Sequence, residues 1–182
     1  MQISDPRAMR ALAHPLRLDL IEVLTTHGPS TAARCGRRLG VSQASCSFHL
    51  RQLAKYGFVE DAPAGADRRE RVWQLTDLEQ GWASGPQTDQ LDRVFIQREA
   101  EKLLGWAGRR EAEPAEWQEA AFIGGASLPV TADELHEIRT GLRAVLSRYV
   151  DRLAEGADRP AGARFVRLLI AGTPGGQTDA ED

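Results

Sequence analysis

Apolar residues recur at helical spacing along the first third of the chain, in runs separated by short breaks. Asp5 is placed to cap a helix whose first residue is Pro6, a position where proline's missing N–H is not needed. The His14-Pro15 pair interrupts this pattern. A second helix is then expected to run until the chain reaches Gly28.

Two further helices follow, joined by a tight turn. Ser30 or Thr31 can cap a short helix that stops at Gly40, where glycine accepts the left-handed backbone. Ser42 can cap the next helix, which runs to Tyr56. Three positions of this helix are apolar at helical spacing and are expected to face inward: Cys46, Leu50 and Leu53.

After Gly57 the period changes from helical to extended. Residues 58–62 predict a short strand, residues 63–67 are rich in turn-forming types, and residues 71–75 alternate like a half-buried strand. A β-hairpin directly after a helix-turn-helix is the outline of a winged helix.

The second half begins with a Gly-, Ser- and Pro-containing linker at 81–87. A helix is expected over 88–107, with apolar members Leu91, Val94, Phe95, Leu103 and Leu104. Residues 108–121 are acidic and interrupted by proline, and 126–130 predict a short strand.

A strongly amphipathic helix is predicted over 131–154. Thr131 and Glu134 form a capping box, and apolar residues follow at spacings of three and four. Residues 163–171 are expected to form a buried strand, and the last ten residues a disordered acidic tail. The predicted fold is therefore mainly α with a small β component: a winged helix-turn-helix domain (1–80), a helical dimerisation and effector region with a small C-terminal α+β unit (81–172), and a tail (173–182).

The net charge of −3 conceals an asymmetry between the two parts of the chain. Residues 1–76 carry 11 Lys and Arg against 7 Asp and Glu, a balance of +4, whereas residues 77–182 carry 12 against 19, a balance of −7. A basic part joined to an acidic part indicates a basic contact surface beside a region with another task.

Several functional classes are disfavoured by what the sequence lacks. It has no apolar stretch of about 18–20 residues that could cross a bilayer. The N-terminal segment MQISDPRAMR lacks the apolar core of a secretory signal. We therefore expect a cytoplasmic protein without membrane contact. No nucleophile–base arrangement or phosphate-cradling glycine loop is present, so neither catalysis nor a cofactor is expected.

The face of the 42–56 helix that lies opposite its apolar stripe carries DNA-reading chemistry. Gln43 and Ser47 can meet base edges, Arg51 and Lys55 can bind phosphates, and Phe48 can meet a thymine methyl or pack against the wing or a partner subunit. The predicted contact residues in this helix and its cap are Ser42, Gln43, Ala44, Ser45, Ser47, Phe48, His49, Arg51 and Lys55. The hairpin adds Arg68, Arg69 and Arg71, which suit phosphate or minor-groove contact or form a solvated charged surface.

These motifs resemble the ArsR family of bacterial dimeric winged-helix repressors. The resemblance covers about residues 5–78 and is carried by the following segments: Ala11-Leu12-Ala13-His14-Pro15-Leu16-Arg17, Leu39-Gly40-Val41-Ser42-Gln43, Ser47-Phe48-His49-Leu50-Arg51-Gln52-Leu53, Gly57-Phe58-Val59 and Val72-Trp73-Gln74-Leu75-Thr76. The second half resembles a C-terminal extension of actinobacterial regulators of this type.

The resemblance implies that Ser42, Gln43, Ser47, Phe48 and His49 occupy DNA-reading positions. Phe48 stands where the family often has His or Arg. Many relatives sense metals through a Cys-x-Cys before the recognition helix or through Asp and His pairs on the C-terminal dimer helix, and this sequence has neither pattern. No metal site is expected.

Cys35 and Cys46 permit two interpretations. They are either buried thiols that behave as small apolar residues, or a thiol switch between neighbouring helices. Similarly, five aromatic residues of the second half either form core or enclose a small organic effector: Trp82, Trp106, Trp117, Phe122 and Tyr149.

The function that follows is a homodimeric, sequence-specific DNA-binding repressor. It is expected to read a pseudo-palindromic operator in double-stranded DNA through the 42–56 helix and the 62–71 wing. The first helix and the 88–107 helix are the expected dimer interface. Two alternatives remain open: a winged-helix module that binds a protein, and a redox-sensing repressor that uses Cys35 and Cys46.

Overall fold

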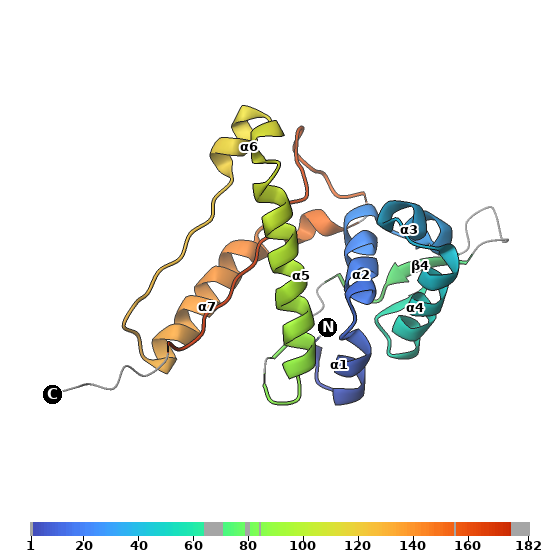
Figure 1. The fold of residues 1–182 in the computed structure, drawn as a ribbon, viewed down its shortest axis with the longest axis horizontal. Helices are drawn as coiled ribbons and strands as arrows, with labels where there is room; N and C mark the ends of the chain where they lie inside the picture. Colours follow the sequence, from blue (N-terminus) through green and yellow to red (C-terminus); the bar gives the residue numbers. More distant parts are fainter. Residues whose placement is uncertain (1, 64–70, 79–80, 84, 155, 176–182) are drawn as a thin grey trace. The chain divides into compact units, whose positions relative to one another are not determined.

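The computed structural model describes residues 2–63, 71–78, 81–83, 85–154 and 156–175 (Figure 1). The chain divides into two compact units. The first comprises residues 1–113 with 153–155, and the second residues 114–152 with 156–182.

Five α-helices form the frame of the first unit, in the order that the sequence predicts: α1 (Pro6–Leu12), α2 (Pro15–His27), α3 (Ala32–Leu39), α4 (Gln43–Lys55) and α5 (Asp89–Ala107). The predicted helix starts are confirmed by their caps. The Asp5 carboxylate accepts from the Arg7 N–H at 2.9 Å. Thr31, rather than Ser30, caps α3 by accepting from the Arg34 N–H. His14 caps α2 with its own ring nitrogen, a role that the sequence did not predict.

A small antiparallel sheet packs beside the helices in the order β2 (Ser30–Thr31), β4 (Val72–Leu75), β3 (Val59–Asp61). The β3–β4 pairing confirms the predicted hairpin strands, with Val59 opposite Leu75 and Asp61 opposite Trp73. The hairpin tip at 64–70 lies outside the described residues. A second, parallel pair joins β1 (Gln2–Ile3) to β5 (Gly81–Trp82), so part of the predicted linker is a strand.

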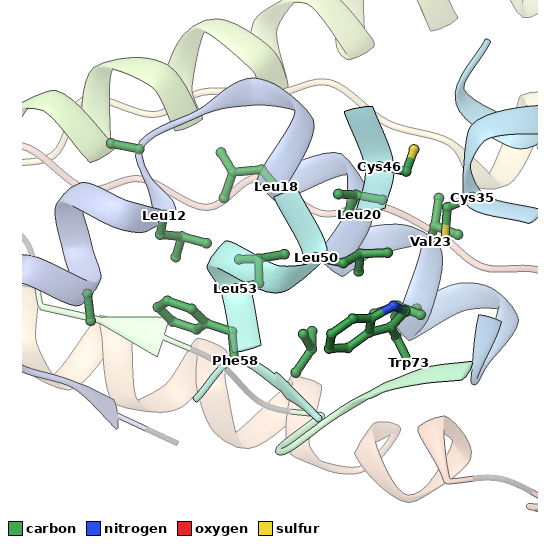
Figure 2. Close-up of a cluster of buried hydrophobic side chains, with 14 of the residues drawn as sticks. Leu12, Leu18, Leu20, Val23, Cys35, Cys46, Leu50, Leu53, Phe58 and Trp73 are labelled. Carbon is green, nitrogen blue, oxygen red and sulfur yellow. The ribbon is translucent and has the colours of Figure 1, made fainter. Parts of the chain in front are cut away.

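The core of the first unit gathers side chains from helices and hairpin (Figure 2). Leu12, Leu20, Leu50, Leu53 and Phe58 are almost fully buried. Burying an aliphatic or aromatic side chain of this size contributes about 1.5–3 kcal/mol, so this cluster holds α4 to α1 and α2. It fixes the position of α4 and thereby the direction of its outer face.

Helix α5 forms where predicted, but the expected apolar stripe is only partly correct. Leu91 is buried, whereas Leu103 and Leu104 are 41% and 72% exposed. The buried positions of the next turns are occupied by Arg98 and Glu99. The pattern was misleading because a buried ion-pair network replaces apolar packing there.

Arg98 is the centre of that network. Its Nε donates to Asp19 at 2.7 Å, its Nη1 donates to Glu99 at 2.7 Å, and its Nη2 also donates to Glu22. Lys102 pairs with Glu22 as well. Burial disfavours the charge of Arg98, but the hydrogen bonds and charges of Glu22 and Asp19 outweigh it and raise its pKa. One guanidinium therefore ties α5 to α2.

The region after α5 is more helical than predicted. A 3₁₀ turn covers Arg110–Ala112, and α6 (Ala115–Ala120) forms within the stretch expected to be irregular. In α7 (Ala132–Ser147) the predicted capping box is present: Glu134 N–H donates to Thr131 Oγ1, and Thr131 N–H donates to Glu134 at 2.7 Å.

α7 ends at Ser147 rather than at residue 154. The Ser147 hydroxyl donates to the Ala144 carbonyl in the last turn of α7, and a 3₁₀ turn follows at Val150–Leu153.

The two strands predicted in the second unit are wrong. Residues 126–130 and 163–171 form no strand, and Phe165 to Ile170 include five large apolar side chains that are 44–63% exposed. An apolar run becomes a strand only where another strand edge pairs with it, and the described residues provide none here. The predicted C-terminal α+β unit is therefore a helix with irregular segments.

The described residues are mainly helical with a small sheet component, as expected. The predicted division at residue 80 and the tail at 173–182 stay predictions, and residues 176–182 lie outside the described part of the chain. Among the helices of the described residues, none has both the length and the apolar character needed to cross a bilayer.

Candidate nucleic-acid interface

The turn between α3 and α4 is closely packed. Gly40 adopts a left-handed backbone with φ of 68°, as expected for the residue that ends α3. Gly36 lies so close to the turn that a Cβ there would be 2.7 Å from the Val41 carbonyl oxygen. Ser42 then accepts from the Ser45 N–H at 3.1 Å and begins α4.

Helix α4 has one fully buried face and one exposed face. Cys46, Leu50 and Leu53 show no exposed surface, which confirms that they face inward. On the opposite side Phe48 is 52% exposed, and Gln43 and Ala44 are exposed as well. The Phe48 ring is therefore accessible to another molecule from the outer face of α4.

Four of the predicted site residues come together in a hollow of about 170 Å³ between α4, the start of α3 and β4. Gln43, Ser47 and Arg51 line it from α4, and Arg71 lines it from the hairpin. Thr31 and Trp73 complete the walls. Arg51 Nη1 donates to Ser47 Oγ at 3.0 Å, which orients the guanidinium along the outer surface of α4. The hollow offers amide, hydroxyl and cationic groups suited to a polar, anionic polymer.

Arg71 is held in place by its own hairpin. Its Nη2 donates to Asp61 Oδ2 at 2.7 Å, and its guanidinium lies 4.1 Å from the centre of the Trp73 ring. The hydrogen bond lowers the pKa of Asp61 and raises that of Arg71. Asp61 compensates part of the charge of Arg71, so Arg71 is less free to bind a phosphate than the sequence implied.

The remaining predicted residues are spread over the same helix and the hairpin. Ser45 is half-buried, and Lys55 lies at the end of α4 with its Nζ 5.7 Å from the centre of the Tyr56 ring. Arg68 and Arg69 fall outside the described residues.

His49 packs inward against the residue that caps α2. The rings of His49 and His14 lie 4.4 Å apart between centroids, and the Phe48 ring meets His49 edge-on at 5.1 Å. Within the described part of the chain, His49 Nδ1 is buried without a hydrogen-bond partner. Burial, followed by the charge of Arg17, lowers the pKa of His14, and burial with His14 and Arg17 lowers that of His49.

The two cysteines behave as small apolar residues. Cys35 and Cys46 are fully buried on α3 and α4 (Figure 2). Burial raises the pKa of Cys35 to about 11 and also raises that of Cys46, so both thiols are protonated at neutral pH. A reactive thiol is exposed and has a lowered pKa, so these surroundings favour a packing role over a redox switch.

The aromatic residues considered for an effector lie in separate surroundings. The Trp82 indole N–H donates to the Asp92 carboxylate at 2.7 Å, and its ring packs edge-on against Phe95. Trp82 therefore contacts the first turns of α5. Trp106 and Trp117 each lie beside an arginine, and Phe122 and Tyr149 are 79% and 53% exposed. No group of three or more His, Cys, Asp and Glu side chains in the described ranges could hold a metal ion.

Two comparisons with known proteins identify a helix-turn-helix in the part of the chain that carries this surface. A helix-turn-helix domain model matches residues 12–62, which span α2 to β3. The HTH-type transcriptional regulator Rv2034 of Mycobacterium tuberculosis is 38% identical over 88 residues, and the match covers 43% of this chain and 78% of the relative. The chain belongs to the HTH-type transcriptional regulators.

The chain also aligns with solved structures of other proteins. The YusO protein from Bacillus subtilis is 16% identical with a TM-score of 0.36, and the alignment covers 79% of this chain and 83% of that one. The transcriptional regulator Tm0710 from Thermotoga maritima is 15% identical with a TM-score of 0.33, covering 74% and 77%. The helix-turn-helix match and the relative Rv2034 place the chain among DNA-binding transcriptional regulators rather than enzymes.

Three residues that line this surface were not predicted as site residues from the sequence: Thr31, Trp73 and Arg37. Thr31 and Trp73 were predicted as a cap and a strand residue, and both also line the hollow. Arg37 of α3, which was not predicted as a site residue, lies beside Gln43. An exposed arginine one helical turn before the tight turn was the signal available for it.

Proposed function

We propose that this protein is a homodimeric repressor of the ArsR type that reads a pseudo-palindromic operator with α4. The observation that carries the proposal is the exposed face of α4, where Gln43, Ser47 and Arg51 share one hollow and Phe48 stands out beside them. The N-terminal turns of a recognition helix are the part that meets base edges in the major groove.

Each residue of this face has a distinct proposed role. Gln43 and Ser47 hydrogen-bond to base edges, with the glutamine amide suited to the paired donor and acceptor of adenine. Arg51, Lys55 and Ser42 contact phosphates, and Phe48 packs on a thymine methyl. Ala44 and Ser45 allow close approach of the helix, while His49 supports it from behind.

The wing is proposed to contact the neighbouring backbone or minor groove through Arg68, Arg69 and Arg71. The acidic excess of residues 77–182, −7 against +4 for residues 1–76, favours an orientation in which the basic part meets DNA.

Dimerisation is proposed through α1 and α5. On α5, Ile96 and Leu104 are 57% and 72% exposed, and together with Leu103 they are spaced seven and eight residues apart on one face. An apolar stripe of this kind on a long helix is suited to a second copy. An effector that alters this interface would regulate DNA binding.

The proposal is tested by selecting genomic DNA fragments with the purified full-length protein and sequencing them. We expect enrichment of a two-fold symmetric site. Gel-shift titrations with Gln43→Ala, Ser47→Ala and Arg51→Ala should then weaken binding, the first two by about 1–3 kcal/mol at particular bases. Unchanged DNA binding in all three variants would exclude α4 as the reading helix and favour a protein-binding module.

A further inference from the structure

A second hollow lies on the other side of Gln43, between α3 and the start of α4. It measures about 230 Å³ and is lined by Ala33, Gly36, Arg37, Val41 and Gln43. The residues that it shares with the hollow beside Arg51 are Ala33 and Gln43. Gln43 therefore stands between two openings, and each of them has arginine in its wall.

On the α3 side, this second hollow is lined by two small residues and one arginine. Ala33, Gly36 and Arg37 are three and four residues apart and face the same side of α3. Ala33 and Gly36 bring little beyond backbone, and the backbone of Gly36 lies close to the turn. Arg37 is the charged side chain of the set, so the opening presents one guanidinium beside a base-reading residue.

Arg37 differs from its neighbour Arg38 in its surroundings. Arg38 Nη1 donates to His27 Nε2 at 3.3 Å, which directs it toward the end of α2. Arg37 is exposed, and no acidic side chain of the described residues pairs with it. An arginine without a carboxylate partner keeps its full charge for an anion from outside the chain.

We propose that the hollow between α3 and α4 receives a phosphodiester of the DNA backbone, with Arg37 as the residue that binds it. The inference rests on the proposed function and extends the DNA contact from α4 to α3. A phosphate here would lie beside the base contacted by Gln43, so Arg37 would set the register of α4 on the duplex without reading sequence itself.

The test compares Arg37→Gln with Arg38→Gln in the full-length protein. Each removes one positive charge from the same helix, and thermal unfolding checks that both variants are folded. Binding is measured against salt concentration on the selected operator and on an unrelated duplex of equal length. We expect Arg37→Gln to lower the affinity for both duplexes by a similar factor, about tenfold per protomer. The slope of log affinity against log salt concentration should decrease in magnitude by about 1 per protomer.

Arg38→Gln should leave the slope unchanged, and Arg37→Lys should restore the slope because it restores the charge. A wild-type slope in Arg37→Gln, or an equal loss in Arg38→Gln, overturns the role of Arg37 while the proposed function stands. Absence of DNA binding by the wild-type protein overturns both proposals.

Discussion

The imidazole rings of His14 and His49 lie 4.4 Å apart and join the cap of α2 to the outer helix α4. Burial and the nearby charge of Arg17 lower the pKa of His14, and burial with His14 and Arg17 lowers that of His49, from an ordinary value of 6.5. The packing of α4 on the cap of α2 therefore favours the neutral form of both rings.

Stability should fall when the solution becomes acidic. As the pH falls through about 6.5, the unfolded chain binds protons at these positions that the folded chain does not bind, so the free energy of unfolding decreases. Thermal unfolding between pH 8 and pH 5 measures the effect. His49→Gln should flatten the profile, whereas His136→Gln, at an exposed position of α7, should not.

Gly36→Ala should destabilise the first unit. The added methyl group would be 2.7 Å from the Val41 carbonyl oxygen, so α3 and the turn must separate, at a cost of about 1–3 kcal/mol. Gly141→Ala is the matched control, because nothing lies within 4 Å of its added Cβ in α7. It should stabilise its helix by up to about 1 kcal/mol. Urea denaturation of the two variants should therefore shift in opposite directions.

Arg98→Met should destabilise the protein by about 3–5 kcal/mol, because Asp19, Glu22 and Glu99 would lose their shared partner. Arg93→Gln breaks an exposed pair with Asp89 in the same helix and should leave the free energy of unfolding almost unchanged, because water and salt screen an exposed ion pair. Equal losses in the two denaturation curves would contradict the central role of Arg98.

Phe48→Ala should separate DNA affinity from stability. Because the ring is 52% exposed, its removal should change the free energy of unfolding by about 0.5 kcal/mol or less. DNA affinity should decrease severalfold through the lost thymine contact. A variant with wild-type affinity for the selected operator would remove Phe48 from the interface.

Leu104→Glu should convert the proposed dimer into a monomer. The side chain is 72% exposed in the single chain, so the change should leave folding intact while placing a charge in the apolar stripe of α5. Sedimentation equilibrium of the variant and the wild-type protein gives the masses directly. A wild-type monomer at micromolar concentration would reject the interface.

The first unit could be predicted well because its signals are local. Pro6, Gly40 and Ser42 mark ends of helices through their own backbone chemistry, and the spacing of Cys46, Leu50 and Leu53 fixes the inner face of α4. The outer face follows by geometry, which is why Phe48 was correctly expected outside.

The failures have a common cause in contacts between distant segments. Nothing near Arg98 in the sequence indicates that Asp19 and Glu22 lie beside it. Residues 163–171 have the composition of a strand but no partner edge in the described chain, and composition alone does not reveal this. The compensation of Arg71 by Asp61 likewise depends on the register of the hairpin.

The ion pairs of Arg98 span 79 and 76 positions of the chain, to Asp19 and to Glu22. During synthesis, α2 therefore leaves the ribosome long before its partner on α5 has been translated. A fragment that ends at residue 80 would contain all of α1 to α4 and still lack Arg98 and the buried Leu91. The contacts of α5 with α2 can therefore form only after α5 has been translated.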